Sequence, residues 1–415
     1  MPQVSVNLSC SIADSFRVRQ VCGFFDLSLP ATATQRFSVT LPAVDEPWKI
    51  GLITGPSGSG KTSVARAAFP GAASLPAWPP DRAIVDCLHG DIRQVTRVLT
   101  AVGFASAPAW LRPYRSLSGG EQFRADLARQ LLSPADAAAP AVMDEFTSTV
   151  DRTAARIGAA AVAAAIRNGA VQRRFVAVTC HHDVAQWLCP DWCLDMATGS
   201  LQRFYPFPAN SAPEPGPDPS NSPESGKLAI GPSSAADPDL QRHQPRRTRG
   251  LLCRPEIRIA VYRCSPGYWA LFKRHHYLSA SLPAAVRCYL GCLSSPDLIA
   301  GSDLSAVPVA FAAIAPVAGF GGYRRFSRVV VLPDYQGIGI GAAFRDTVAG
   351  MEAPGCRRLS LVTSHPGMIR SLHVSRNWAA VSTVLSQPRK SRRGSPPAGQ
   401  RRVCSFVWVG SQCRN

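Results

Sequence analysis

Residues 48–62 read WKIGLITGPSGSGKT and join an apolar run to a glycine-rich loop. Residues 48–54 have the pattern of a short buried strand, and residues 55–62 match G-x-x-x-x-G-K-[ST] in full. Glycines let successive backbone N–H groups curl around phosphates, and a helix beginning near Lys61 adds its partial positive charge. The stretch therefore predicts a phosphate-binding loop (P-loop) between a strand and a helix, and with it an α/β domain.

The side chains of this loop and of a later acidic pair predict a Mg-ATP site. Lys61 is expected to reach the β- and γ-phosphates, and the Thr62 hydroxyl to ligate Mg²⁺. Asp144 ends a second apolar run, at residues 139–143, and is expected to hold the metal from the other side, while Glu145 polarises the attacking water. The residues predicted to contact the nucleotide are Gly55, Ser57, Gly58, Ser59, Gly60, Lys61, Thr62 and Ser63.

Further motifs narrow the class of nucleotidase. Residues 117–122 read LSGGEQ and precede an amphipathic helical pattern, residues 148–151 read STVD, and His181 and His182 follow a third apolar run at residues 175–179. In this order they resemble the signature motif, D-loop and switch histidine of ATP-binding-cassette (ABC) ATPases. The resemblance covers about residues 4–205.

The ABC resemblance implies a homodimer that sandwiches ATP. Ser118 and Gly120 would complete the γ-phosphate site of the opposite protomer, and His181 or His182 would contact the γ-phosphate. We prefer His181, because Thr179 and Cys180 would finish the strand. LSGGEQ also fits a helix start with Ser118 as N-cap, and the two interpretations are compatible.

Three departures favour the soluble, non-transport branch of the family. Only 57 residues separate Lys61 from Ser118, no convincing glutamine follows the strand expected at residues 83–86, and Phe146 stands where proline is common. An ATP-binding transporter subunit is the alternative. The aromatic residue that stacks on adenine stays open among Phe16, Phe24 and Phe25, and each of them fits a core position equally well.

Composition divides the chain and suggests its compartment. Residues 207–250 are dense in Pro and Ser and predict a flexible linker between a domain at residues 1–206 and one at residues 251–415. The 13 cysteines show no paired spacing, which favours reduced thiols in the cytoplasm. The longest apolar run, residues 306–320, is shorter than the roughly 20 residues of a membrane span.

The C-terminal half contains a second glycine-rich loop. Residues 325–344 read RFSRVVVLPDYQGIGIGAAF, in which Gln336, Gly337, Gly339 and Gly341 lie between a strand and a helix pattern. This segment resembles the acyl-CoA motif of GNAT acetyltransferases, which implies acetyl-CoA as donor and a mixed α/β domain over about residues 257–410. A tight strand-to-helix turn is the alternative interpretation. We expect strands at residues 307–314, 327–332, 358–363 and 403–409, and a helix at residues 341–351.

Acid–base groups for acyl transfer are harder to identify, because residues 241–415 contain only six acids. Residues 274–278 read RHHYL and offer His275, His276 and Tyr277 on an expected helical stretch, although a partly buried helix face fits equally well. His365 and His373 are further candidates. The spacing does not demand a metal site from His275 and His276 with Cys288 or Cys292.

The net charge of +18 is concentrated in the C-terminal half. Residues 1–240 hold 20 Lys+Arg against 21 Asp+Glu, whereas residues 241–415 hold 25 against 6. Such an excess suits a polyanion partner, because neutralised phosphates release counterions. An arginine-rich codon usage is the alternative explanation, since only five of the 45 basic residues are Lys.

Together these features predict an α/β protein in which an ABC-type ATPase domain is joined to a GNAT-like domain that acylates an amine on nucleic acid. ATP-driven dimerisation would position or gate the second domain. The alternative is an ATP-dependent nucleic-acid clamp with a non-catalytic C-terminal module.

Overall fold

The computed structural model describes residues 3–28, 32–72, 75–134, 139–204, 255–276, 281–294, 307–386 and 401–410. Within them the chain forms three sheets with helices, so the expected mixed α/β character is confirmed. The linker expected at residues 207–250, and also Tyr277, lie outside the described residues.

The N-terminal part has a five-stranded sheet in the order β4-β5-β3-β6-β7, parallel except for β7. Every residue of β3 and of β5 is buried, as expected for a parallel sheet covered on both faces. Ile50 and Leu52 face one core and Ile53 faces the other. The strands are β3 (Ile50–Thr54), β4 (Ala141–Met143), β5 (Phe175–Thr179), β6 (Trp192–Asp195) and β7 (Ser200–Arg203).

Helices cover this sheet, and one expected strand proved to be helical. Residues 83–86 form no strand, because Ile84–Cys87 is a 3-10 helix and Ala83 makes only an isolated bridge to Pro113. Proline has no N–H with which to continue a ladder. The α-helices of this part are α1 (Phe16–Phe25), α2 (Lys61–Ala68), α3 (Ile92–Ala101), α4 (Ala107–Trp110), α5 (Gly119–Leu131), α6 (Arg152–Arg167) and α7 (Ala185–Leu188).

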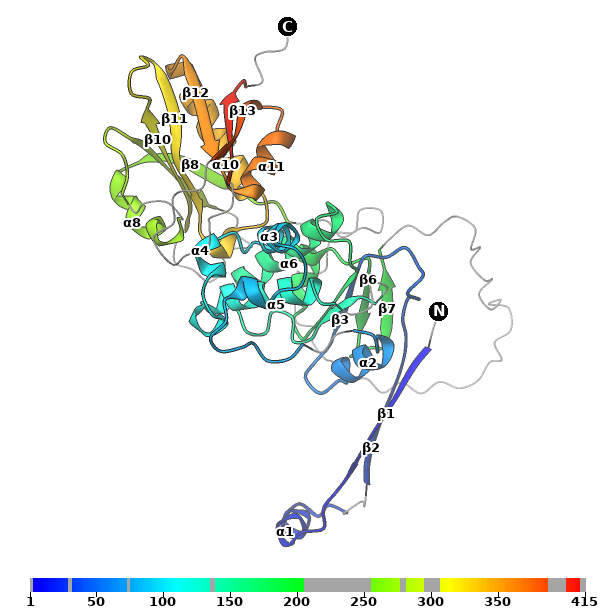
Figure 1. Ribbon diagram of the computed structural model, residues 1–415. Coiled ribbons are helices and arrows are strands. Elements are labelled where there is room, and N and C mark those ends of the chain that lie inside the picture. Colours follow the sequence, from blue (N-terminus) through cyan, green and yellow to red (C-terminus); the bar gives the residue numbers. More distant parts are fainter. Residues whose placement is uncertain are drawn as a thin grey trace, which may run out of the picture.

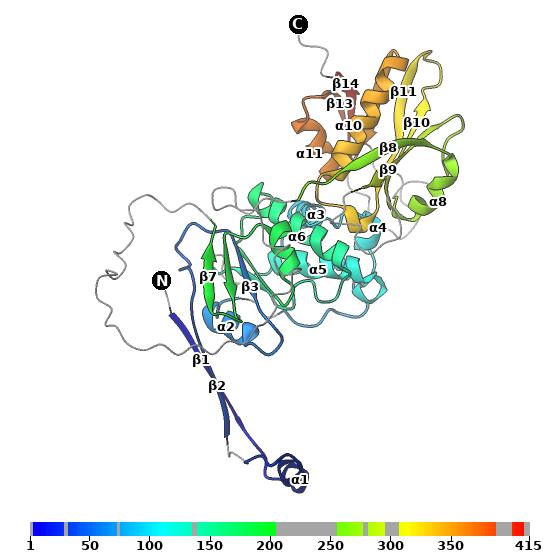
Figure 2. The ribbon, with the colours of Figure 1, turned by 180° about the vertical axis from the view of Figure 1, so that it is seen from behind.

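A hairpin of β1 (Gln3–Ser11) and β2 (Thr32–Thr40) projects from the body as an arm, with α1 at its far end (Figures 1 and 2). The adenine-stacking candidates Phe16, Phe24 and Phe25 lie on this distal helix and are 71–79% exposed. In both views α1 lies away from the P-loop helix α2, and the exposure of these side chains excludes the core interpretation. The arm separates them because α1 is inserted between the two strands.

The C-terminal part has a seven-stranded sheet in the order β13-β14-β12-β11-β10-β9-β8. Only β11 and β12 run parallel, and their ladder ends at the pair Phe326 and Leu361. The strands are β8 (Ile259–Cys264), β9 (Arg287–Leu293), β10 (Val307–Pro316), β11 (Tyr323–Val331), β12 (Arg358–Thr363), β13 (Trp378–Ser386) and β14 (Arg401–Trp408). The α-helices are α8 (Trp269–Phe272), α10 (Ile340–Glu352) and α11 (Pro366–Val374).

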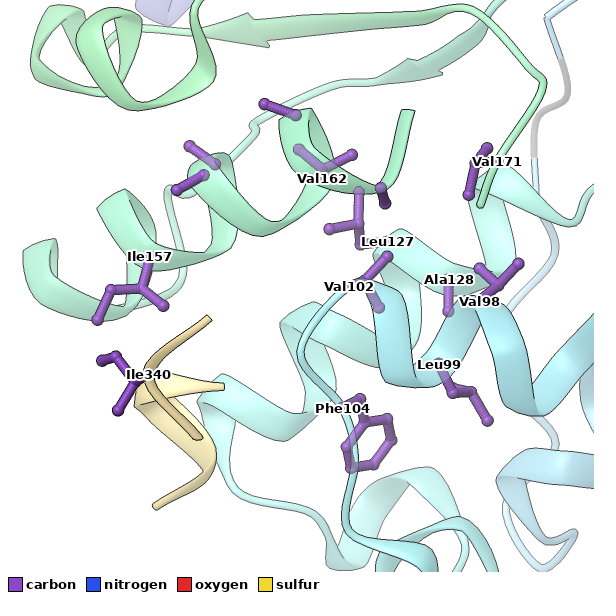
Figure 3. Packing of buried hydrophobic residues seen from close by; sticks show 14 of the residues in the cluster. Val98, Leu99, Val102, Phe104, Leu127, Ala128, Ile157, Val162, Val171 and Ile340 are labelled. Carbon is purple, nitrogen blue, oxygen red and sulfur yellow. The ribbon is translucent and has the colours of Figure 1, made fainter. Parts of the chain in front are cut away.

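The two parts pack against each other through one continuous hydrophobic cluster. Ile340, at the start of α10, belongs to the same buried cluster as Val102, Phe104 and Ile157 of the N-terminal part. Figure 3 shows Ile340 opposite Ile157 of α6. The sequence suggested two domains separated by a linker, whereas the folded chain brings the second glycine-rich loop onto the helices of the first part.

Candidate functional site

The loop predicted to be a P-loop, residues 55–62, contains glycines in the left-handed region. Gly58 and Gly60 have φ angles of 77° and 82°, and Gly60 caps α2 in the left-handed region, which only glycine adopts readily. The Lys61 ammonium donates to the carbonyls of Gly55 and Pro56 at 2.9 and 2.6 Å. The loop thus holds the lysine while the first N–H groups of α2 stay available.

The acidic pair lies against the P-loop at the carboxyl edge of the sheet. The Thr62 hydroxyl donates to Asp144 Oδ1 at 3.2 Å, so two oxygen atoms suited to Mg²⁺ are adjacent. Ser148 donates to Glu145 Oε2 at 2.7 Å. Glu145 and Thr147 have φ angles of 51° and 70°, and a β-branched residue in this region is strained. The strained turn keeps Glu145 exposed beside Asp144.

His182 is the histidine that contacts the P-loop strand. A hydrogen bond of 3.2 Å joins His182 Nδ1 to the Thr54 hydroxyl. His181 instead uses its backbone N–H, which donates to Thr179 Oγ1 at 3.1 Å. Of the two candidates, His182 is therefore the one whose side chain contacts β3.

Phe37 is an aromatic residue beside the P-loop that was not predicted from the sequence. A Cβ added at Gly60 would lie 2.6 Å from the Phe37 ring, so this ring packs directly on the P-loop. Nothing in the sequence marks Phe37, because β2 contains no recognisable motif and the chain has 17 phenylalanines.

The LSGGEQ motif begins α5 and also contacts the C-terminal part. Ser118 caps the helix in a capping box with Glu121, as the N-cap interpretation predicts. The carboxylate of Asp334, in a 3-10 turn before the second glycine-rich loop, lies where a Gly120 side chain would be, 2.6 Å from its Cβ position. The fully buried Arg124 pairs with Asp334 at 3.3 Å. Burial lowers the pKa of Arg124, and the Asp334 carboxylate opposes that shift.

The second glycine-rich loop repeats the backbone geometry of the P-loop. Gly339 caps α10 with φ 94° and ψ −5°, close to the 82° and 12° of Gly60. A Cβ added at Gly339 would meet open space, and Gly341 follows in the first turn of α10. Unpaired N–H groups at such a helix start can bind a phosphate group.

Gln336 and Gly337 are committed to the contact between the two parts. Gln336 Oε1 accepts from the Ala105 N–H at 2.9 Å, and its Nε2 donates to the Val331 carbonyl at 2.7 Å. A Cβ added at Gly337, whose φ is 88°, would lie 2.7 Å from Ala161 Cβ and 2.9 Å from Gly103 Cα. The sequence predicted that both residues bind a cofactor directly, and it did not predict their contact with the N-terminal part.

Beside this loop, β11 diverges from β12. Ser327 is an extra residue in the β10–β11 ladder, because Arg328 pairs with Ala313 and Phe326 with Ile314. From Ser327 onward β11 has no partner on its β12 side among the described residues. Backbone groups on that side can therefore hydrogen-bond an extended ligand.

The acid–base candidates differ in their surroundings. Burial, with a contribution from Arg328, lowers the pKa of His276 to about 4. His365 caps α11 and bonds through Nε2 to the Ala105 carbonyl at 3.3 Å, so it joins the two parts. His373 packs edge-on against Phe406.

Each acid in the described C-terminal residues has an arginine partner. The four acids are Glu256, Asp334, Asp346 and Glu352. The described residues contain no group of three potential metal ligands. The cluster considered around His275 is therefore not found among them. They also contain no helix long and apolar enough to cross a membrane.

Comparisons relate part of the chain to acetyltransferases. No protein-family model matches the chain, and no curated protein matches it. It is similar to the ribosomal-protein-S18-alanine N-acetyltransferase of Escherichia coli, with 15% identity, a TM-score of 0.27, and coverage of 38% of this chain and 100% of that one. An IAA acetyltransferase of Bacillus cereus has 12% identity, a TM-score of 0.26 and coverage of 36% and 99%.

A GNAT family acetyltransferase of Elizabethkingia anophelis, solved with acetyl-CoA bound, has 12% identity, a TM-score of 0.26 and coverage of 35% and 96%. Because these identities and TM-scores are low, the similarities say nothing about the substrate of this chain.

Proposed function

We propose that this chain is an acyl-CoA-dependent N-acyltransferase coupled to an ABC-type ATPase unit that binds and hydrolyses Mg-ATP. One observation carries the proposal: two glycine-rich loops, capped by Gly60 and Gly339 in the same left-handed conformation, each begin a helix that has no side-chain cap hydrogen bond. Such helix starts bind phosphate groups, and both ATP and acyl-CoA contain a diphosphate.

In the ATPase unit, Lys61 binds the nucleotide phosphates, and Thr62 and Asp144 hold Mg²⁺. The metal supplies neutralisation of phosphate charge when bound. Glu145 orients the attacking water, and His182 contacts the γ-phosphate from the next strand. Ser118 and Gly120 complete the site of a second protomer, as the ABC resemblance implies.

In the acyltransferase unit, the loop from Gly339 to Gly341 holds the CoA diphosphate, and the free side of β11 binds the extended arm of the donor. The acceptor amine attacks the thioester carbonyl carbon, an N–C bond forms, and the C–S bond breaks. CoA leaves as a thiolate that gains a proton, while the amine loses one. His276 is a weak acceptor for that proton, because burial lowers its pKa to about 4, well below neutral pH.

The contact between Gly120 and Asp334 supports coupling of the two units. In an ATP-sandwiched dimer, the partner's γ-phosphate would approach Ser118 and Gly120, where the Asp334 carboxylate now lies. The γ-phosphate and the Asp334 carboxylate are both negative and would repel each other there. ATP-driven dimerisation therefore requires the turn at Pro333–Tyr335 to move, and that turn leads directly into the acyl-CoA loop.

Nucleic acid is the acceptor that we propose, because residues 241–415 hold 25 basic against 6 acidic residues. Its binding is expected to weaken steeply between low and physiological salt. A salt-independent affinity would contradict this part of the proposal.

A second candidate is an ATP-dependent nucleic-acid clamp whose C-terminal part has no catalytic role. It is favoured by the pairing of every described C-terminal acid with an arginine. Incubation of the full chain with labelled acetyl-CoA and total nucleic acid or protein, with and without ATP, distinguishes the two.

We expect label in nucleic acid that depends on ATP, that is lost in Gly339→Trp, and that no longer responds to ATP in Lys61→Ala. Acetyl-CoA binding without transfer would favour the clamp. A wild-type chain that binds neither acetyl-CoA nor Mg-ATP would contradict both candidates.

A further inference from the structure

An open pocket of about 490 Å³ lies between the two parts of the chain. Its N-terminal wall comes from α3 and from the end of α6 with the following turn, where Arg97, Thr100 and Asn168 line it. Its C-terminal wall is formed by Gly337 and by Arg370 of α11. The volume is in the range of about 300–1,000 Å³ that small-molecule sites occupy.

The charge of the pocket suits an anion. Arg97 and Arg370 reach it from opposite parts of the chain, and no acidic residue lines it. Both side chains are exposed, and within the described residues neither guanidinium has an ion-pair partner. Two arginines without carboxylate partners can bind a phosphate with charge-assisted hydrogen bonds.

The position of the pocket indicates which phosphate-bearing part of a ligand it would bind. Gly337 lines it and lies two residues before Gly339, the cap of α10. A donor whose diphosphate rests on α10 and whose acyl arm follows the free side of β11 must direct its nucleotide end away from that strand. The pocket beside Gly337 is the space that the structure provides for this end.

We infer that Arg97 and Arg370 bind the 3′-phosphorylated adenosine end of CoA, so that the N-terminal part completes the acyl-CoA site. The inference rests on the proposed acyl-CoA function and adds a binding residue, Arg97, that a free-standing C-terminal part would lack. Release of the contact between the parts would then weaken donor binding.

The test compares CoA with 3′-dephospho-CoA as ligands of the full chain in calorimetric titrations. Arg97→Ala is expected to weaken CoA binding roughly tenfold, because one charge-assisted hydrogen bond is lost. Binding of 3′-dephospho-CoA should stay unchanged. Arg93→Ala, at an exposed position of the same helix but outside the pocket, is the matched control and should alter neither affinity.

Three outcomes would overturn the inference. Wild-type affinity for CoA in Arg97→Ala would remove Arg97 from the site, while loss of binding in Gly339→Trp would leave the acyl-CoA function standing. Equal weakening of both ligands would assign Arg97 to the contact between the parts instead of to the 3′-phosphate. A wild-type chain that does not bind CoA would refute the proposed function as well.

Discussion

Replacement of Gly337 by alanine tests whether the second glycine-rich loop is packed against the N-terminal part. A non-glycine residue in the left-handed region costs about 1–2 kcal/mol. The new methyl group would also lie 2.7 Å from Ala161 Cβ and 2.9 Å from the Gly103 backbone, and overpacking of this kind costs about 1–3 kcal/mol. We therefore expect Gly337→Ala to lower the free energy of unfolding by about 2–5 kcal/mol.

Gly339→Ala is the matched control, because Gly339 has a similar φ of 94° but faces open space. It should cost only the conformational term, about 1–2 kcal/mol, and the effect of alanine on the unfolded chain is the same at both positions. Urea unfolding followed by tryptophan fluorescence measures both variants. Equal destabilisation would refute the close approach of Gly337 to Gly103, and with it the packing of the two parts.

Three further predictions concern the nucleotide site and the C-terminal core. Glu145→Gln should slow ATP hydrolysis at least about 100-fold and trap an ATP-bound dimer; a monomer in size-exclusion chromatography with ATP would argue against the sandwich. His182→Ala should reduce the hydrolysis rate far more than His181→Ala, and the reverse order would return the role to His181. Burial raises the pKa of Glu352, but hydrogen bonds from Tyr289 and Arg324 bring it below its usual 4.5. The charged carboxylate therefore stabilises the protein above about pH 4.5, and this contribution is lost as pH falls. Glu352→Gln should lower the free energy of unfolding by about 3 kcal/mol at pH 7 and by much less in acid. A difference in urea unfolding that does not change with pH would contradict this.

Local patterns determined the elements that carry the two loops. The strands expected at residues 175–179 and 358–363 have those bounds in the structure, because short apolar runs between loops contain enough information by themselves. Helix α10 begins one residue before its expected start. The glycines at positions 60 and 339 were identified from their motifs, and both cap a helix in the left-handed region that favours glycine.

Strands without a local pattern were missed. The strands β6 and β7 have only four residues each, too few to establish a period. The edge strands β8 and β13, and β9 beside β8, were also not expected. The strand expected at residues 83–86 failed because a strand requires a partner, and its only partner is a proline.

The sequence by itself determined that this chain contains two glycine-rich loops that each begin a helix, because their geometry depends on neighbouring residues. Only the tertiary structure decided that Gln336 hydrogen-bonds Ala105, 231 residues away, and that Asp334 lies on Gly120. Contacts between distant segments depend on how two surfaces fit in space, and such a fit leaves no periodicity or spacing in either segment. The pocket between Arg97 and Arg370 exists for the same reason only in the folded chain.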